Sequence, residues 1–244
     1  MAHEFNISVA EMTFHIDAIH QYAAYCCRDY WIDYQGEYAI VLSQEDIDKE
    51  REIFLQEIEQ DDGVIFNPSD PYLETIALLR KLADFICMHN RILMHGSCIA
   101  VNGKGYIFTA LSGTGKSTHT ALLRKLHGEN AVMVNDDKPF LYIKDDKVFV
   151  CGTPWNGKHN LGNNMMVPLE GIFFLHRSEE NELNRMDAYH ALTKMMAQCH
   201  RPVSAPEMME TLTIVDYVLA NVPLYDFGCN MDISAAELSS SVMI

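Results

Sequence analysis

One stretch, residues 106–118, constrains this chain more than any other part of it. An apolar run typical of a buried strand leads into a loop that holds Gly113 and Gly115, and a helical pattern begins at Lys116. This order of strand, loop and helix is the one that a phosphate-binding loop of the Walker A type requires. The glycines allow the backbone to curl so that successive N–H groups point inward at phosphate oxygens, and the helix adds the positive end of its dipole.

The residues of this loop predict a site for a nucleoside triphosphate. Lys116 can reach the β- and γ-phosphates, and the Ser117 hydroxyl is placed to bind Mg²⁺. Ala110 stands where the motif usually begins with glycine, and it is small enough for the end of a strand. The alternative is a chance turn before a helix, which would bind nothing. The expected nucleotide-binding residues are Ser112, Gly113, Thr114, Gly115, Lys116, Ser117 and Thr118.

Composition and charge limit the classes of partner. The 244 residues carry a formal net charge of −16, which argues against a nucleic acid or an anionic membrane because both favour a basic surface. The seven cysteines are scattered without a CxxC pair, which is typical of reduced thiols rather than a disulfide framework or a zinc site. The first residues lack the basic start and apolar run of a signal peptide, and no stretch approaches the length of a membrane span. We therefore expect a cytoplasmic protein.

Residues 1–90 predict a small N-terminal lobe that contains strands and two helices. Alternating apolar residues in its first half favour short antiparallel strands. One helix is expected over residues 43–60, capped by a serine, and a second begins at Asp70, which is followed by proline. A turn at residues 61–63 and a short strand at 64–66 are expected between them.

Residues 91–244 are expected to form the nucleotide-binding core, which opens with a strand over residues 92–101. After the helix of the loop, a buried strand over residues 131–134 leads to Asp136 and Asp137. Two carboxylates at the end of such a strand have a specific use. One can hold Mg²⁺ while the other accepts a proton from an attacking hydroxyl. The alternative is a polar turn before the next strand.

The order of His95, the loop 110–117 and the Asp136–Asp137 pair resembles the core of the HPr kinase/phosphorylase family. The loop also resembles that of phosphoenolpyruvate carboxykinases, which share a nucleotide-binding fold with those kinases. The likeness covers residues 93–150 and extends more weakly to about residue 201. It implies an α/β fold in which a P-loop nucleotide-binding core of mixed β-sheet, with flanking helices, follows the small β-containing lobe.

The same resemblance implies roles for the site residues. Asp136 matches the general base that takes the proton from a substrate serine, and Asp137 matches the residue that supports the metal beside Ser117. These two roles can be exchanged between the aspartates. His95 matches a histidine close to the base and would orient Asp136. A carboxykinase is far longer than this chain, and the C-terminal signature of HPr kinases is missing, so the resemblance supports a phosphotransferase site but not the substrate HPr.

Three residues outside the loop and the aspartates are candidates for contacts with the substrate. Lys158 could steady a phosphate or a carboxylate and Trp155 could form a wall, because both lie in a loop after a predicted hairpin. A structural turn with a packed tryptophan explains that loop equally well. Arg177 follows a buried strand and could stabilise charge during transfer, with a surface ion pair as the alternative.

The sequence therefore predicts an enzyme that uses Mg²⁺ and ATP to move the γ-phosphoryl group to a serine-type hydroxyl. The acceptor can be a protein, a peptide or a metabolite, and ADP, GTP or pyrophosphate stay open as donors. The alternatives are a non-catalytic nucleotide-binding regulator and a simple NTP hydrolase. The oligomeric state also stays open, since related kinases often assemble while this chain shows no sustained coiled-coil pattern.

Overall fold

The computed structural model describes residues 3–59 and 67–243. The chain divides into two compact units, Met1–Asp84 and Phe85–Ile244. The boundary expected after Asn90 stays a prediction, and the turn and strand expected at residues 61–66 lie outside the described residues. No helix within the described part of the chain is long and apolar enough to cross a membrane.

Within its described residues, 3–59 and 67–84, the first unit combines a three-stranded sheet with three α-helices and a 3-10 turn. Strands β1 and β2 form an antiparallel hairpin, whereas β3 pairs with β2 in parallel, so the expectation of antiparallel strands alone was wrong. The parallel pairing follows from the long connection after β2, which carries α1 and the 3-10 turn η1. The elements are β1 (His3–Val9), β2 (Met12–Ala18), α1 (Gln21–Cys26), η1 (Arg28–Tyr30), β3 (Tyr38–Val41), α2 (Gln44–Glu59) and α3 (Asp70–Ile86).

The start of α2 shows how local chemistry fixes this unit. The Ser43 N–H donates to Asp46 Oδ2 at 2.8 Å, and the Asp46 N–H faces Ser43 Oγ at 3.4 Å. This reciprocal pair is a capping box with aspartate in place of glutamate, and it confirms the predicted cap. Farther along, Arg80 of α3 forms an ion pair with the buried Glu50 of α2, which fastens the two helices together.

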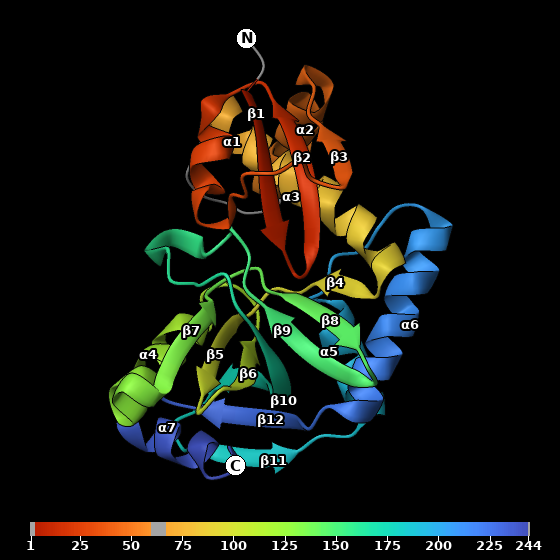
Figure 1. Ribbon diagram of the computed structural model, residues 1–244. Coiled ribbons are helices and arrows are strands. Elements are labelled where there is room, and N and C mark those ends of the chain that lie inside the picture. The colour runs from red at the N-terminus through yellow and green to blue at the C-terminus, as the bar shows by residue number, and fades with distance from the viewer. Residues whose placement is uncertain (1–2, 60–66, 244) are drawn as a thin grey trace. The chain divides into compact units, whose positions relative to one another are not determined.

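The second unit is built on a nine-stranded mixed sheet whose order is β4-β8-β9-β10-β6-β5-β7, with β12 beside β10 and β11 beside β12 (Figure 1). Strand β10 joins the two halves of this sheet. Its first residues pair with β9, and its later residues run parallel to both β6 and β12. The strands are β4 (Arg91–Leu93), β5 (Ser97–Val101), β6 (Lys104–Thr109), β7 (Ala131–Asn135), β8 (Phe140–Lys144), β9 (Lys147–Cys151), β10 (Met166–Arg177), β11 (Glu182–Arg185) and β12 (Leu224–Cys229).

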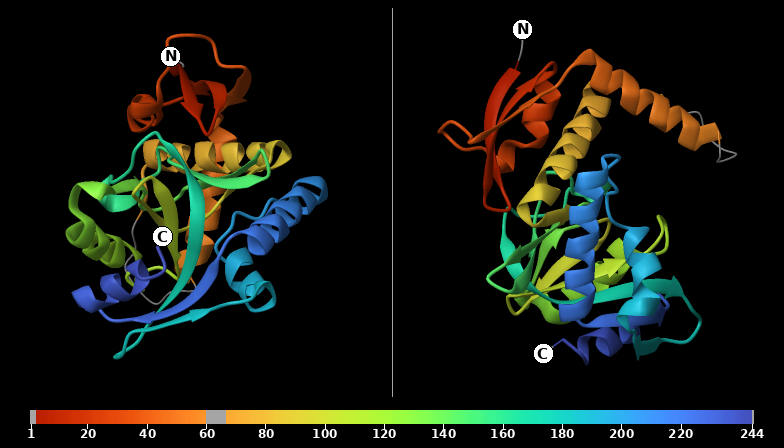
Figure 2. Two further views of the ribbon diagram at one scale, coloured as in Figure 1. Left: turned by 60° about the horizontal axis from the view of Figure 1, so that its bottom comes forward. Right: turned by 90° about the vertical axis from the view of Figure 1, so that its right-hand side faces the viewer.

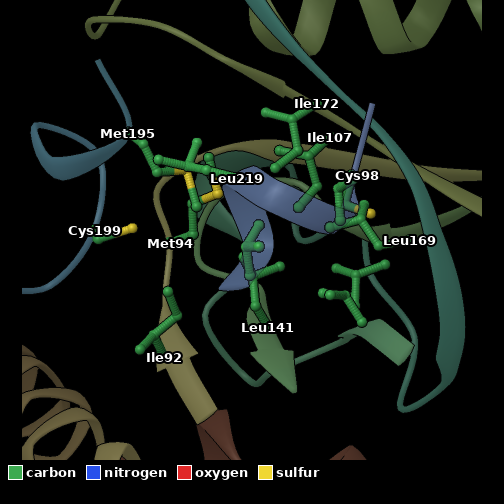
Figure 3. Packing of buried hydrophobic residues seen from close by; sticks show 14 of the residues in the cluster. Ile92, Met94, Cys98, Ile107, Leu141, Leu169, Ile172, Met195, Cys199 and Leu219 are labelled. Atoms are coloured by element: carbon green, nitrogen blue, oxygen red, sulfur yellow. The ribbon is translucent and has the colours of Figure 1, made fainter. Parts of the chain in front are cut away.

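Helices cover both faces of this sheet (Figure 2). Successive residues of a strand point to opposite faces, so Ile107 of β6 packs in one core and Phe108 in the other. Figure 3 shows the first core, in which Met195 and Leu219 come from α5 and α6. The second core receives Leu123 from α4. The helices and 3-10 turns are η2 (Cys87–His89), α4 (Lys116–His127), η3 (Gly128–Asn130), η4 (Gly157–His159), α5 (Ala188–Met196), α6 (Ala205–Asn221) and α7 (Ile233–Ser240).

The single strand expected over residues 92–101 was wrong, because the chain breaks at residues 94–96 into β4 and β5. The two pieces belong to opposite ends of the sheet, where β4 pairs with β8 and β5 lies between β6 and β7. Glycine is needed at the break, since a Cβ on Gly96 would lie 2.9 Å from Ile107 Cγ2. The break turns His95 out of the sheet pairing and leaves it half-buried.

Candidate functional site

The glycine loop lies between the end of β6 and the start of α4, as the sequence predicts. Gly113 and Gly115 have φ angles of 75° and 122°, a region that side chains disfavour. The buried Lys116 folds back over the loop, and its Nζ donates to Ala110 O at 3.0 Å and Leu111 O at 3.2 Å. Burial lowers the pKa of Lys116, and the charge of Asp137 opposes that shift. The loop thus holds a cation beside an N-terminal helix end, an arrangement that suits phosphate oxygens.

The two aspartates follow the end of β7, and the Asn135 side chain closes the turn that carries them. Its Oδ1 accepts hydrogen bonds from the Asp137 N–H at 2.8 Å and the Lys138 N–H at 2.6 Å. Its Nδ2 donates to Asn156 Oδ1 at 2.8 Å, which ties the following loop to the same turn. This side-chain turn is the local reason that consecutive carboxylates emerge at the end of the strand.

The two carboxylates have different surroundings. Asp136 is 6% exposed, and the Ser97 Oγ donates to its Oδ1 at 2.5 Å. The Asp137 side chain is 31% exposed and lies 3.4 Å from His95 Nε2 and 3.8 Å from Lys138 Nζ. Burial raises the pKa of Asp137, and the nearby lysines oppose that shift. The broken strand thus places His95 next to Asp137, whereas the resemblance implies that His95 orients Asp136.

His95 is fixed by groups from distant parts of the chain. Its Nδ1 lies 3.1 Å from Gln198 Oε1, and its backbone N–H donates to Gln198 O at 2.7 Å. Burial lowers the pKa of His95 to about 4, with Lys138 and Lys116 adding to the shift. The imidazole is therefore neutral at physiological pH, with its Nε2 next to the Asp137 carboxylate.

One cavity of about 830 Å³ brings most of these residues together. A space of this size accommodates a nucleotide together with part of a second molecule. Its lining includes the loop, the start of α4, both aspartates and the turn η4. The lining residues are His95, Ser112, Gly113, Gly115, Lys116, Ser117, Thr118, Ala121, Arg124, Asp136, Asp137, Gly157, Lys158, His159 and Leu161.

Three of the expected site residues are not in this lining. Thr114 belongs to the loop, but it is not among the residues that line the cavity. Arg177 supports the loop from β10, where its Nη2 donates to Gly113 O at 2.6 Å. Trp155 is half-buried, and its backbone N–H donates to Thr153 Oγ1 at 3.3 Å. Arg177 therefore contacts the glycine loop from outside the lining, and Trp155 is not part of the lining.

Several residues of the site were not predicted from the sequence. Ser97 and Gln198 hold Asp136 and His95, and nothing in an unaligned sequence indicates these distant contacts. Arg124 and His159 line the cavity itself. Arg124 carried one usable signal, since it lies seven residues after Ser117 and therefore on the same face of the helix.

Oxygen donors in the cavity suit Mg²⁺. Ser117, Asp136 and Asp137 all line the same space, and hydroxyl and carboxylate oxygens are the ligands that this ion takes together with water and substrate phosphates. Among the described residues, we find no cluster of three or more histidine, cysteine or acidic side chains that could hold a metal without substrate. The donor set thus fits an ion that arrives with a phosphate ligand.

Comparison with known proteins adds little to this geometry. No protein-family model matches the chain, and no curated protein matches it. Among solved structures, the HPr(Ser) kinase/phosphatase from Coxiella burnetii is similar with a TM-score of 0.37 and 11% sequence identity, over 62% of this chain and 93% of that one. A likeness at this level carries no argument about function. The mixed α/β fold with flanking helices is as expected, and the case for a function depends on the cavity.

Proposed function

We propose that this chain is a Mg²⁺- and ATP-dependent phosphotransferase that moves the γ-phosphoryl group to a serine-type hydroxyl. The observation that carries the proposal is the shared cavity, in which the glycine loop, Lys116 and Ser117 face Asp136 and Asp137. A phosphate loop opposite two carboxylates supplies both a binding site for the donor and a base for the acceptor.

The roles of the loop follow from its contacts. Backbone N–H groups of residues 112–118 would bind the β- and γ-phosphates, and Lys116 would exchange its contacts with Ala110 O and Leu111 O for phosphate oxygens. Ser117 and Asp136 would hold Mg²⁺, which neutralises charge on the phosphates when it is bound. We give Asp136 this role because it is nearly buried and held by Ser97.

We assign the role of general base to Asp137. The resemblance leaves this assignment open, because the roles of the two aspartates can be exchanged. Asp137 is the more exposed of the two carboxylates and lies beside His95, so a hydroxyl in the cavity can approach it. In the reaction the acceptor oxygen bonds to the γ-phosphorus while the bond from that phosphorus to the β,γ-bridging oxygen breaks. The hydroxyl proton passes to the Asp137 carboxylate, and ADP leaves.

Transfer of label from γ-labelled ATP into a host-cell extract tests the proposal. The extract is separated into protein, peptide and small-molecule fractions, and Lys116→Ala and Asp137→Asn are compared with the wild type. Lys125→Ala is the matched control, because Lys125 lies on the exposed side of the same helix and outside the cavity. We expect label in one fraction, lost in both site variants and kept in the control.

Two other outcomes would overturn the proposal. Release of labelled phosphate at a rate that no fraction changes would identify a hydrolase. Binding of ATP without labelled acceptor or phosphate release would identify a nucleotide-binding regulator.

A further inference from the structure

The cavity contains a second cationic region that the proposed donor site does not use. Arg124 lines the cavity from α4, and Lys158 lines it from the turn η4. The chain as a whole carries a net charge of −16, so positive side chains that gather around one cavity are not a general property of its surface. The positive side chains in its lining therefore distinguish this cavity from the rest of an acidic chain.

Arg124 lies well beyond the glycine loop. Ser117, Ala121 and Arg124 lie four and three residues apart on α4, so they share one face of the helix, and all three line the cavity. At about 1.5 Å of rise per residue, Arg124 Cα is roughly 10 Å along the axis from Ser117 Cα. The cavity therefore continues along the helix past the place where a β- or γ-phosphate would bind.

The guanidinium of Arg124 also has an unmet hydrogen-bonding requirement. Its Nε is buried and has no hydrogen-bond partner among the described residues. A buried N–H on a charged group is unfavourable without an acceptor, so such a group favours a ligand that supplies one. Carboxylates and phosphates match the forked geometry of guanidinium best.

The turn η4 brings a second cation to the neighbourhood of the proposed base. A Cβ on Gly157 would lie 3.3 Å from Asp137 Cβ, so this turn packs directly against Asp137. Gly157 has a φ of 63°, which glycine adopts without strain, and the next residue is the exposed Lys158. A molecule whose hydroxyl reaches Asp137 thus lies within the space that Lys158 and Arg124 also line.

We propose that the phosphoryl acceptor carries an oxyanion, either a carboxylate or a phosphate, which Arg124 binds with the help of Lys158 while the acceptor hydroxyl faces Asp137. This inference rests on the proposed phosphotransferase function and narrows its substrate class to hydroxyl compounds with a neighbouring negative charge. It assigns Arg124 and Lys158 to acceptor specificity rather than to binding of the nucleotide.

Calorimetry on the full chain tests the inference. The protein is first saturated with Mg²⁺ and a non-hydrolysable ATP analogue, so that the glycine loop is filled, and inorganic phosphate or acetate is then titrated as the probe. We expect the wild type to bind one of these probes at a single site. Arg124→Leu should weaken that binding by at least about tenfold and Lys158→Met by about two- to fivefold, because Lys158 is exposed and interacts through water.

Lys125→Leu is the matched control on the same helix and should bind the probe as the wild type does. Preference for phosphate or for acetate then separates a phosphorylated acceptor from a carboxylate-bearing one. The inference is overturned if neither probe binds, or if Arg124→Leu binds the probe as well as the wild type does. It is also overturned if Arg124→Leu weakens binding of the ATP analogue as strongly as Lys116→Ala does. A wild type that fails to bind the analogue overturns the proposed function, whereas normal analogue binding with no probe site overturns only this inference.

Discussion

Replacing Ser97 by alanine is the sharpest perturbation of the site because it removes one oxygen from a buried chain of hydrogen bonds. The Ser97 hydroxyl has no exposed surface and connects Asp136 Oδ1 at 2.5 Å with Thr120 Oγ1 at 2.9 Å. Because Ser97 gives its proton to Asp136, the Thr120 hydroxyl donates to Ser97 Oγ, and Thr120 belongs to α4. The Ser97 side chain thus couples a proposed metal-binding carboxylate to the helix that carries the proposed phosphate loop.

The expected magnitude follows from the charge of Asp136. A hydrogen bond to a charged group contributes about 1.5–3 kcal/mol, and Asp136 is too buried for water to replace the lost donor easily. We therefore expect the free energy of unfolding of Ser97→Ala to fall by about 1.5–3 kcal/mol. If the displaced carboxylate weakens the transition state by the same amount, transfer slows by roughly 10- to 100-fold.

Urea titration measures the first quantity, and the initial rate of label transfer into the acceptor fraction measures the second. Thr120→Val is the control, because it removes the other partner of Ser97 but leaves the bond to Asp136 in place. It should cost about 1 kcal/mol of stability and change the rate by less than about threefold. Equal rates in folded Ser97→Ala and wild type would refute the idea that Ser97 positions Asp136.

Three further predictions concern stability and the loop. Burial lowers the pKa of His119 to about 4, whereas in the unfolded chain it is about 6.5. The contribution of His119 to the free energy of unfolding is therefore complete above about pH 6.5 and falls by roughly 3 kcal/mol as the pH drops through 4. In urea titrations, His119→Gln should lose less stability than the wild type between about pH 7 and about pH 4.5, and equal losses would contradict this. Phe173→Ala removes a ring centred 4.7 Å from the rings of both Phe108 and Tyr225. The free energy of unfolding of this variant should fall by about 3–5 kcal/mol, whereas a fall below about 1 kcal/mol would mean that the ring is not packed. Gly115→Ala forces a side chain to a φ of 122° and should weaken binding of the ATP analogue by at least about tenfold in calorimetry, so unchanged affinity would argue against the loop as the phosphate site.

Local sequence signals predicted the parts of the site that depend on neighbouring residues. The strand, glycine loop and helix around Lys116 are set by glycine at positive φ and by an apolar run, and both are visible in the sequence. The turn that presents Asp136 and Asp137 is likewise local, because Asn135 closes it with its own side chain.

Contacts between distant residues could not be predicted in this way. The position of His95 depends on Gln198, which lies 103 residues later in the chain. The break between β4 and β5 places Gly96 against Ile107 and Phe108, in close packing that only the folded sheet creates. The sequence places Arg124 on the same helix face as Ser117, but the cavity that it lines is formed only by the folded chain.

We propose that the glycine loop binds the phosphates of a nucleoside triphosphate opposite the two aspartates. A crystal structure with Mg²⁺ and a non-hydrolysable ATP analogue tests it most directly. We expect the β- and γ-phosphates against the N–H groups of residues 112–118, with Lys116 Nζ turned from Ala110 O to a phosphate oxygen. A nucleotide bound elsewhere, with Lys116 still on the carbonyls of the loop, would contradict it.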